Sequence, residues 1–214
     1  MMDTGTGSPK RATYRHGDLH RALLEAGTEL ARTGGPEAVV LREATRRAGV
    51  APSAAYRHFA DRRALLGAVC SVAQSALAFA MEEDLAGVSL AGASADAARA
   101  RLRAVGTGYL RFARTEPGLF RTAFSASEDL QNAGSPARSG EGGLTPFQLL
   151  AAALDGLVEA GVLPRERRPG AEFLAWSAVH GLAMLLIDGP LRGLDRAQAE
   201  GATRRLLDMV ERGL

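Results

Sequence analysis

The chain has 214 residues, of which 46% are hydrophobic and 23% charged, and its formal net charge is +2. This length allows one large domain or a small domain joined to a larger one, and the composition excludes a disordered chain and collagen. A single cysteine, Cys70, excludes a disulfide scaffold and a zinc finger. Residues 1–63 hold 11 Lys and Arg against 7 Asp and Glu (+4), whereas residues 64–214 hold 15 against 17 (−2). This asymmetry indicates a basic, nucleic-acid-binding head on a nearly neutral body.

The residue types favour helices over strands. Ala occurs 41 times and Leu 29 times, whereas the β-branched Ile occurs once. Ala and Leu are strong helix formers, and strands prefer β-branched residues. No proline stands between Pro52 and Pro117, which leaves room for several long helices. We therefore expect an all-α protein of about nine helices.

Residues 1–15 are polar and rich in Gly, Ser and Thr, and they predict a flexible arm that ends in basic residues. Four helices are expected after this arm. The first begins at the N-cap Asp18 and ends at Gly34-Gly35-Pro36, because Gly and then Pro stop a helix. The others span 42–48, 52–59 and, after the N-cap Asp61, 61 to about 84.

The remaining helices follow from the same signals of capping and periodicity. They are expected at 94–115, at 117–124, from the Thr145-Pro146 pair to 161, at 171–187, and from an Asp195–Gln198 capping box to about 213. The Gly- and Ser-rich stretch 125–143 predicts a flexible loop. The longest apolar run, 173–187, has 15 residues, fewer than the ~20 that span a bilayer. Residues 1–9 also lack the apolar stretch of a secretory signal, so we expect a cytoplasmic protein without membrane association.

Residues 40–63 have the spacing of a helix-turn-helix, with two short helices joined by a tight turn at Gly49. The small side chains of Ala44 and Ala48 let the two helices approach, and Gly49 takes a turn conformation that a Cβ would resist. The residues expected to form the core behind the second helix are Val50, Ala55 and Phe59.

Small and donor-bearing side chains are expected on the outer side of this unit, which suits entry into a DNA groove. Arg57 could bind a guanine edge or a phosphate, and Arg62 stands at the start of the next helix, where anions bind. The predicted DNA-binding residues are Arg42, Pro52, Ser53, Ala54, Tyr56, Arg57, His58 and Arg62. Helix pairs with surface arginines are common, so the spacing alone leaves a DNA reader and a purely structural helix pair equally open.

The strings TYRHGDLHRALLEAGTELARTGG (13–35) and LREATRRAGVAPSAAYRHFADRRALL (41–66) resemble the DNA-binding domain of the TetR family of transcriptional regulators. The resemblance implies an N-terminal arm over 1–15, a helix-turn-helix domain over 16–62 and a ligand-binding and dimerisation domain over 63–214. It also implies that Tyr56 and His58 contact phosphates, that Arg57 contacts the groove or backbone, and that Arg62 contacts the backbone. Many members carry Ser or Thr where this chain has Leu41 and Ala51, two side chains that can neither cap a helix nor bind phosphate.

Farther along, Trp176, His180 and Gly181 resemble the Trp-His-Gly signature of one TetR C-terminal subgroup. The family usually holds an effector cavity between its middle helices. By that resemblance, the predicted lining residues are Phe112, Phe120, Phe124, Trp176 and His180. Trp176 and His180 could instead be core or subunit-contact residues. Few charged residues interrupt these helices, which favours a largely apolar effector over a polyanion.

The last two helices predict the interface of a homodimer. The stretch 173–187 is apolar nearly all round, and a monomer could not cover it on every side. Two helices from each subunit would form a four-helix bundle with two-fold symmetry. That symmetry predicts double-stranded, palindromic operator DNA with half-sites about 34–36 Å apart, or a multiple of this. We predict a repressor that a small, largely apolar effector releases from its operator.

No pattern favours catalysis or metal binding. His16 and His20 have the spacing of metal ligands, but no further ligand cluster accompanies them, and no phosphate-binding loop is found. We expect no catalytic residue, no cofactor and no metal. Two other hypotheses stay open: a helical small-molecule-binding enzyme or carrier with a vestigial DNA-binding head, and an architectural DNA-binding protein without an effector. The latter would bind DNA in a manner that depends on salt but not on sequence.

Overall fold

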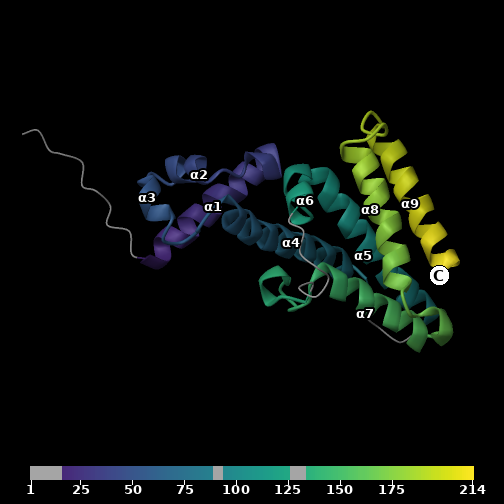
Figure 1. Cartoon of the computed structure of the whole chain (residues 1–214). Coiled ribbons are helices and arrows are strands. Elements are labelled where there is room, and N and C mark those ends of the chain that lie inside the picture. Colours follow the sequence, from purple (N-terminus) through teal and green to yellow (C-terminus); the bar gives the residue numbers. More distant parts are fainter. Residues whose placement is uncertain (1–15, 89–93, 126–133) are drawn as a thin grey trace, which may run out of the picture.

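Helix α4 (Arg62–Ala86) joins a small N-terminal head to a larger body in the computed structural model (Figure 1). The structure describes residues 16–88, 94–125 and 134–214, and these contain nine α-helices and no strand, which confirms the all-α prediction. The helices are α1 (His16–Gly34), α2 (Leu41–Arg47), α3 (Pro52–Ala55), α4, α5 (Ala95–Thr115), α6 (Pro117–Ala123), α7 (Pro146–Glu159), α8 (Ala171–Ile187) and α9 (Arg196–Gly213). Three short 3-10 helices complete the described part: η1 (Pro36–Ala38), η3 (Pro136–Arg138) and η4 (Arg165–Arg167).

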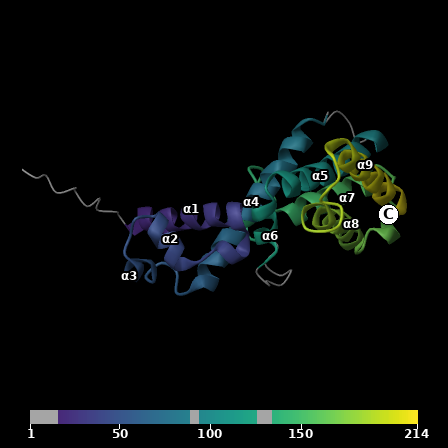
Figure 2. The same ribbon diagram turned by 90° about the horizontal axis from the view of Figure 1, so that it is seen from above.

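The head consists of α1, α2, α3 and the N-terminal part of α4, and it lies at one end of an elongated molecule (Figure 2). Helices α5 to α9 form the body at the other end. One continuous cluster of buried apolar side chains runs from Leu19 in α1 to Leu214 after α9. Because head and body share this core, a displacement of the body helices against α4 can reach the head.

The predicted helix caps are confirmed at three starts. The Asp61 carboxylate accepts a hydrogen bond of 2.8 Å from the Ala64 N–H, and the Thr145–Gln148 and Asp195–Gln198 pairs both form complete capping boxes. Each cap satisfies N–H groups that have no partner within the helix.

Two predicted helix boundaries in the head were wrong. Asp18 does not cap the first helix, because α1 already begins at His16. The third helix ends at Ala55 and not at Phe59. The N–H groups of His58 and Phe59 both donate to the Ala55 carbonyl, at 2.9 Å each, so the chain turns here and Phe59 enters the core.

Helix α4 contains the longest uncharged stretch of the chain, 64–81, although the apolar run singled out from the sequence was 173–187. By length and composition α4 could cross a membrane, with a mean hydropathy of 1.8 in its most apolar window. Its apolar side chains instead pack against α1, α5, α6 and α7. The composition of α4 is therefore explained by its place in the core.

The predicted flexible loop 125–143 is ordered over residues 134–143. Residues 126–133 of this stretch and the predicted arm 1–15 lie outside the described residues. Two contacts hold the ordered part on α4. The Ser75 hydroxyl donates to the Ser139 carbonyl at 2.7 Å, and the Glu82 carboxylate accepts from the N–H groups of Glu141 and Gly142 at 2.8 and 3.1 Å. Composition alone could not reveal these long-range bonds.

Candidate functional site

The helix-turn-helix geometry is present as predicted. Gly49 has φ +68°, a left-handed conformation that favours glycine, and the next N–H, of Val50, donates to the Thr45 carbonyl at 3.0 Å. Ala44 and Ala55 are fully buried between the two helices. Leu41, at a position where the family often has Ser or Thr, is buried in the core, and neither α2 nor α3 has a side-chain cap.

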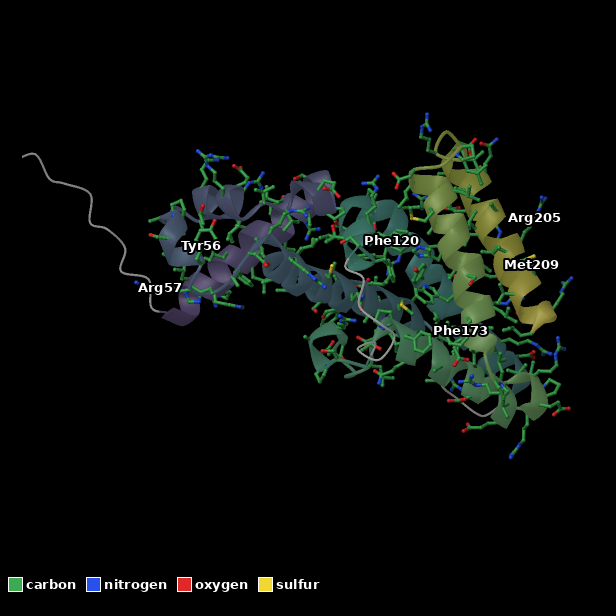
Figure 3. All side chains as sticks on the ribbon, viewed as in Figure 1. Tyr56, Arg57, Phe120, Phe173, Arg205 and Met209 are labelled. Atoms are coloured by element: carbon green, nitrogen blue, oxygen red, sulfur yellow. The ribbon has the colours of Figure 1, made fainter. Side chains whose placement is uncertain are left out.

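Six of the predicted DNA-binding residues are exposed. One of them, Arg62, has a guanidinium that is bonded within the head, and the other five lie on the exposed side of the head. Tyr56 is the most prominent, with 61% of its surface exposed, and it stands beside Arg57 at the end of the head that lies farthest from α8 and α9 (Figure 3). The other three of these five residues are Arg42, Pro52 and Ser53. These residues form what we call the outer face of the head.

The other three predicted DNA-binding residues are engaged within the head. Ala54 is half-buried and packs against the core. The His58 ring is also half-buried, lies edge-on to His20 at 6.1 Å, and has a buried Nε2 atom. The Arg62 guanidinium donates to the carbonyls of Val39 and Pro36 at 2.9 and 2.8 Å. It thereby ties the start of α4 to the segment that precedes α2.

The charged side chains on and beside the outer face differ in whether another residue of the head already pairs with them. Glu43 holds Arg46 with two hydrogen bonds of 2.6 and 2.9 Å and also contacts Arg47. Hydrogen bonding from Arg46 lowers the pKa of Glu43 to about 2, so this carboxylate offsets part of the basic charge of α2. Arg42 and Arg57 make no ion pair with the residues that the structure describes, which leaves both charges open to a phosphate or base.

The body contains a cavity of about 500 Å³ between α4, α5, α6, α7, α8 and α9. This volume is typical of a site for a small organic molecule. Phe124, Trp176 and His180 line it, whereas the predicted lining residues Phe112 and Phe120 lie in the core behind it, 5% and 0% exposed. Phe120 nevertheless stacks on His180, with ring centroids 5.5 Å apart, so it supports one wall.

Three polar side chains form a hydrogen-bonded chain along the wall. The Trp176 indole donates to the Tyr109 hydroxyl at 3.1 Å, and the Tyr109 oxygen lies 2.8 Å from His180 Nδ1. Burial raises the pKa of Tyr109 and lowers that of His180, so the phenol stays protonated and the imidazole neutral. The bond between the Tyr109 hydroxyl and His180 Nδ1 is therefore a hydrogen bond between two neutral groups.

Two further lining residues, Tyr109 and Arg138, were not predicted from the sequence. Tyr109 lies on α5, 67 residues from Trp176, and only the tertiary fold brings them together. Arg138 is 6% exposed and lies on η3, inside the stretch that composition predicted to be a flexible loop. Arginine is rarely this buried, which is the one structural signal that draws attention to it.

Helix α6 connects the cavity to the head. Its C-terminal residue Ala123 and the following Phe124 line the cavity. Near its start, a Cβ at Gly118 would lie 2.2 Å from the Arg32 carbonyl oxygen, so the backbones of α6 and α1 touch. Arg32 also pairs with Glu116, just before α6, and Arg121 on α6 holds Asp188 at the end of α8 with bonds of 2.6 to 3.0 Å.

The outer sides of α8 and α9 expose large apolar side chains. Leu174 is 66% and Met209 58% exposed, and Phe173 and Leu185 are also exposed. Met209 points away from the body (Figure 3). Gly181 lies on the exposed side of α8, with open space where a Cβ would stand. These five apolar or small residues define the α8–α9 face.

Among the residues that the structure describes, no three metal-ligating side chains come together. His20, one half of the predicted His16–His20 spacing, stacks on Phe59 with ring centroids 4.8 Å apart.

The chain resembles solved structures over nearly its whole length. A protein of unknown function from Rhodococcus sp. RHA1 is 26% identical, with a TM-score of 0.72, over 95% of this chain and 99% of that one. The TetR family transcriptional regulator PfmR from Thermus thermophilus is 24% identical, with a TM-score of 0.56, over 90% and 98%. A TetR family transcription regulator from Marinobacter aquaeolei VT8 is 19% identical, with a TM-score of 0.59, over 89% and 94%. A comparison with curated proteins found no match.

Two family models match the chain. The model of the tetR family of bacterial regulatory proteins matches residues 23–69, and that of the tetracyclin repressor-like C-terminal domain matches residues 102–210. The first contains the helix-turn-helix and the second contains most of the body. Members of this family are DNA-binding transcription regulators and not enzymes, which removes the enzyme hypothesis. The second match alone spans half of the 214 residues, and the chain therefore belongs to the TetR family of transcriptional regulators.

Proposed function

We propose that the protein represses transcription and that a small, largely apolar effector in the body cavity releases it from DNA. The observation that carries this proposal is the position of α6. One end of this helix lines the cavity through Ala123 and Phe124, and the other end touches α1 of the head at Gly118. An effector that binds better to one position of α6 would shift the population between two placements of the head.

The exposed outer face of the head is the proposed DNA-binding surface. Arg57 is proposed to contact a base edge or a phosphate, Tyr56 to donate its hydroxyl to a phosphate, and Arg42 to contact the backbone. Pro52 and Ser53 would lie close to the groove at the start of α3. Ala54, His58 and Arg62 are expected to contribute less, because each is half-buried or bonded within the head. In this proposal residues 16–62 act as the DNA-binding domain and 63–214 as the sensor.

The proposed assembly is a homodimer that forms through the α8–α9 face. Its exposed apolar side chains would be covered by the same face of a second copy, and Gly181 would allow the two α8 helices to approach closely. A two-fold axis would present two heads to a palindromic operator. A regulator of this kind would act on chromosomal DNA in the cytoplasm. The subgroup resemblance of Trp176, His180 and Gly181 stays a prediction.

A gel-shift assay with DNA from upstream of the gene tests the proposal directly. We expect a specific complex whose affinity falls steeply with salt, because phosphate contacts release counterions. A screen of apolar metabolites should then find compounds that dissociate it. Binding that depends on salt but not on sequence would support the architectural protein. Failure to bind at this and neighbouring promoters would support the carrier.

A further inference from the structure

Helix α6 ends at the wall of the cavity, and a side chain of α4 holds its last carbonyl there. The Gln74 side-chain amide donates from Nε2 to the Ala123 carbonyl at 2.7 Å. Because a carbonyl oxygen can only accept, the nitrogen of the amide must face Ala123, which fixes the orientation of the Gln74 side chain. Both residues line the cavity, so this bond lies where an effector would touch the protein.

The Ala123 carbonyl depends on Gln74 for its hydrogen bond. The last carbonyls of a helix have no partner within the helix. The preceding one, of Thr122, accepts from Cys70 Sγ at 2.8 Å and from the Ser125 hydroxyl at 2.9 Å. Among the described residues, only Gln74 donates to the Ala123 oxygen. Ala123 is 2% exposed, so loss of this bond would leave a buried carbonyl without a partner, which is unfavourable unless the end of α6 moves.

The Gln74 amide also has hydrogen-bonding capacity that the protein does not use. A primary amide offers two N–H donors and one acceptor oxygen. Within the described part of the chain, the bond to Ala123 is the only hydrogen bond of this side chain. The rings of Phe124 and Trp176 line the same cavity. An apolar ligand with an acceptor oxygen could therefore contact these rings and bond to Gln74.

We propose that Gln74 is a positioning residue that couples occupancy of the cavity to the position of α6. In the free protein Gln74 holds the end of α6 in the placement that binds DNA. An apolar effector with an acceptor oxygen, such as a ketone carbonyl, bonds to the amide and draws it away from Ala123. The other end of α6 contacts α1 at Gly118, so a shift of this helix changes the placement of the head. This inference rests on the proposed function, because it takes the cavity to be the effector site.

Variants of the full-length protein test the hold on α6 without a ligand. Gln74→Met keeps the length of the side chain but cannot donate, so it should weaken operator binding about three- to tenfold, as expected for the loss of one hydrogen bond. Ser75→Ala is the matched control, because it removes another 2.7 Å bond from α4 to a backbone carbonyl, that of Ser139, which lies outside α6. It should leave operator affinity within about twofold.

Fluorescence anisotropy with labelled operator measures both affinities. Circular dichroism checks the fold of each variant, and Gln74→Leu replaces Gln74→Met if the latter is unfolded. Unchanged operator affinity of the Gln74 variant, or an equal loss in Ser75→Ala, would overturn the hold on α6.

A pair of flat probes tests the contact between ligand and Gln74. Fluorenone carries a ketone carbonyl on an apolar ring system, and fluorene has the same rings without the oxygen. Trp176 is the only tryptophan of the chain and lines the cavity, so its fluorescence measures the binding of both probes. The ratio of fluorenone affinity to fluorene affinity should be about threefold or more higher in the unsubstituted protein than in Gln74→Met.

Infrared spectroscopy reports the hydrogen bond itself. The carbonyl stretching band of bound fluorenone should lie at lower wavenumber in the unsubstituted protein than in Gln74→Met, because a hydrogen bond weakens the C=O bond. A loss of packing alone would not move this band. An affinity ratio or a band position that is the same in both proteins would overturn the contact with Gln74.

Operator release distinguishes failure of this inference from failure of the proposed function. If both probes release the operator equally well, and do so in Gln74→Met as well, the effector-released repressor stands and the role of Gln74 fails. If fluorenone bonds to Gln74 but the operator stays bound, the contact stands, whereas the coupling to α6 and the proposed release both fail. If neither probe changes the fluorescence of Trp176, the ligand contact fails, whatever the variants do to operator binding.

Discussion

Arg57 is the residue on which DNA affinity is expected to depend most directly. It is exposed on the outer face and makes no ion pair with the described part of the chain, so its charge is available to DNA. Arg57→Ala should weaken operator binding by about 1–3 kcal/mol if the side chain contacts a base edge. Fluorescence anisotropy with the operator and with scrambled DNA measures this effect.

The same titrations distinguish two roles of Arg57. A loss confined to the operator indicates base contact, whereas an equal loss on both DNAs and a smaller salt slope indicate a phosphate contact. Arg165→Ala, which removes an exposed arginine from η4 in the body, is the control and should leave both affinities unchanged. An unchanged operator affinity of Arg57→Ala would contradict the proposed surface.

His180 predicts how stability responds to mild acid. Burial lowers its pKa below the ordinary value of 6.5, so the unfolded chain takes up this proton first as the pH falls. Stability due to neutral His180 is therefore full above about pH 6.5 and is lost as the pH falls through that value towards the folded-state pKa. His180→Asn keeps an acceptor for Tyr109 but does not titrate. Urea unfolding at pH 7 and pH 5 should show a smaller loss for His180→Asn than for the unsubstituted protein, and equal losses would contradict the prediction.

At the residue scale, the sequence predicted chemical types better than orientations. Tyr56 and Arg57 are exposed as expected, because polar side chains after a short helix tend to face solvent. Arg62 looked equally available, yet it donates to Val39 and Pro36, and such a bond to distant backbone carbonyls leaves no pattern in the sequence. The burial of Arg138 was missed for the same reason. The composition around it predicts a loop, and its tertiary contacts leave no pattern in the sequence.

Helix α6 is the element whose packing the proposed release depends on. A Cβ at Gly118 would lie 2.2 and 2.4 Å from the carbonyl oxygens of Arg32 and Ala31, and backbone atoms cannot yield as a flexible side chain can. Gly118→Ala should therefore separate α6 from α1 and lower the free energy of unfolding by about 1–3 kcal/mol. It should also change the effector concentration that releases the operator, because the contact between cavity and head is altered.

The same substitution on α7 provides a matched control. Gly156 lies within this helix, and nothing stands within 4 Å of the position where its Cβ would be. Gly156→Ala should raise the free energy of unfolding by about 0.5–1 kcal/mol, since alanine loses less backbone entropy in a helix. Urea unfolding of both variants would then give opposite signs. A destabilisation of similar size in both would show that the contact between α6 and α1 is not special.

At the scale of the helices, the residues at which they begin could be predicted from the sequence, whereas the contacts between them could not. Local signals placed the caps Asp61, Thr145 and Asp195, because a cap depends on residues three positions apart. The third helix was predicted too long, since Phe59 leaves the helical path to enter a core that forms only with α1 and α4. The cavity could be expected only through the family resemblance, because its walls come from six separate α-helices and from η3.

At the scale of the whole molecule, the charge asymmetry matches the separation of the proposed DNA-binding surface from the proposed effector site and dimer interface. The +4 segment contains the head, and the −2 segment contains the cavity and the α8–α9 face. A single basic head would hold DNA weakly, because affinity for DNA rises with the number of phosphates contacted. Two heads on one rigid dimer reach both half-sites, and the second binds at a high effective concentration.

The α8–α9 face is therefore expected to determine both the oligomeric state of the protein and its affinity for DNA. Leu174 and Met209 are 66% and 58% exposed, and burying them against a second copy would stabilise the dimer by the removal of apolar surface from water. Changing both to Glu would place four carboxylates in the interface of a symmetric dimer. Light scattering after gel filtration should then show the mass fall from twice the chain mass to the single chain mass of 22.4 kDa.

Phe79→Glu is the control for this change, since it places an acid at an apolar residue of α4 that is 45% exposed and lies outside the α8–α9 face. It should leave the dimer intact and operator affinity unaltered. The Leu174→Glu, Met209→Glu variant should keep its helical content, because neither side chain supports the core, yet lose most of its operator affinity. A monomer that still binds the full operator as tightly as the dimer would show that the two heads act independently. A variant that remains dimeric would place the interface elsewhere on the body.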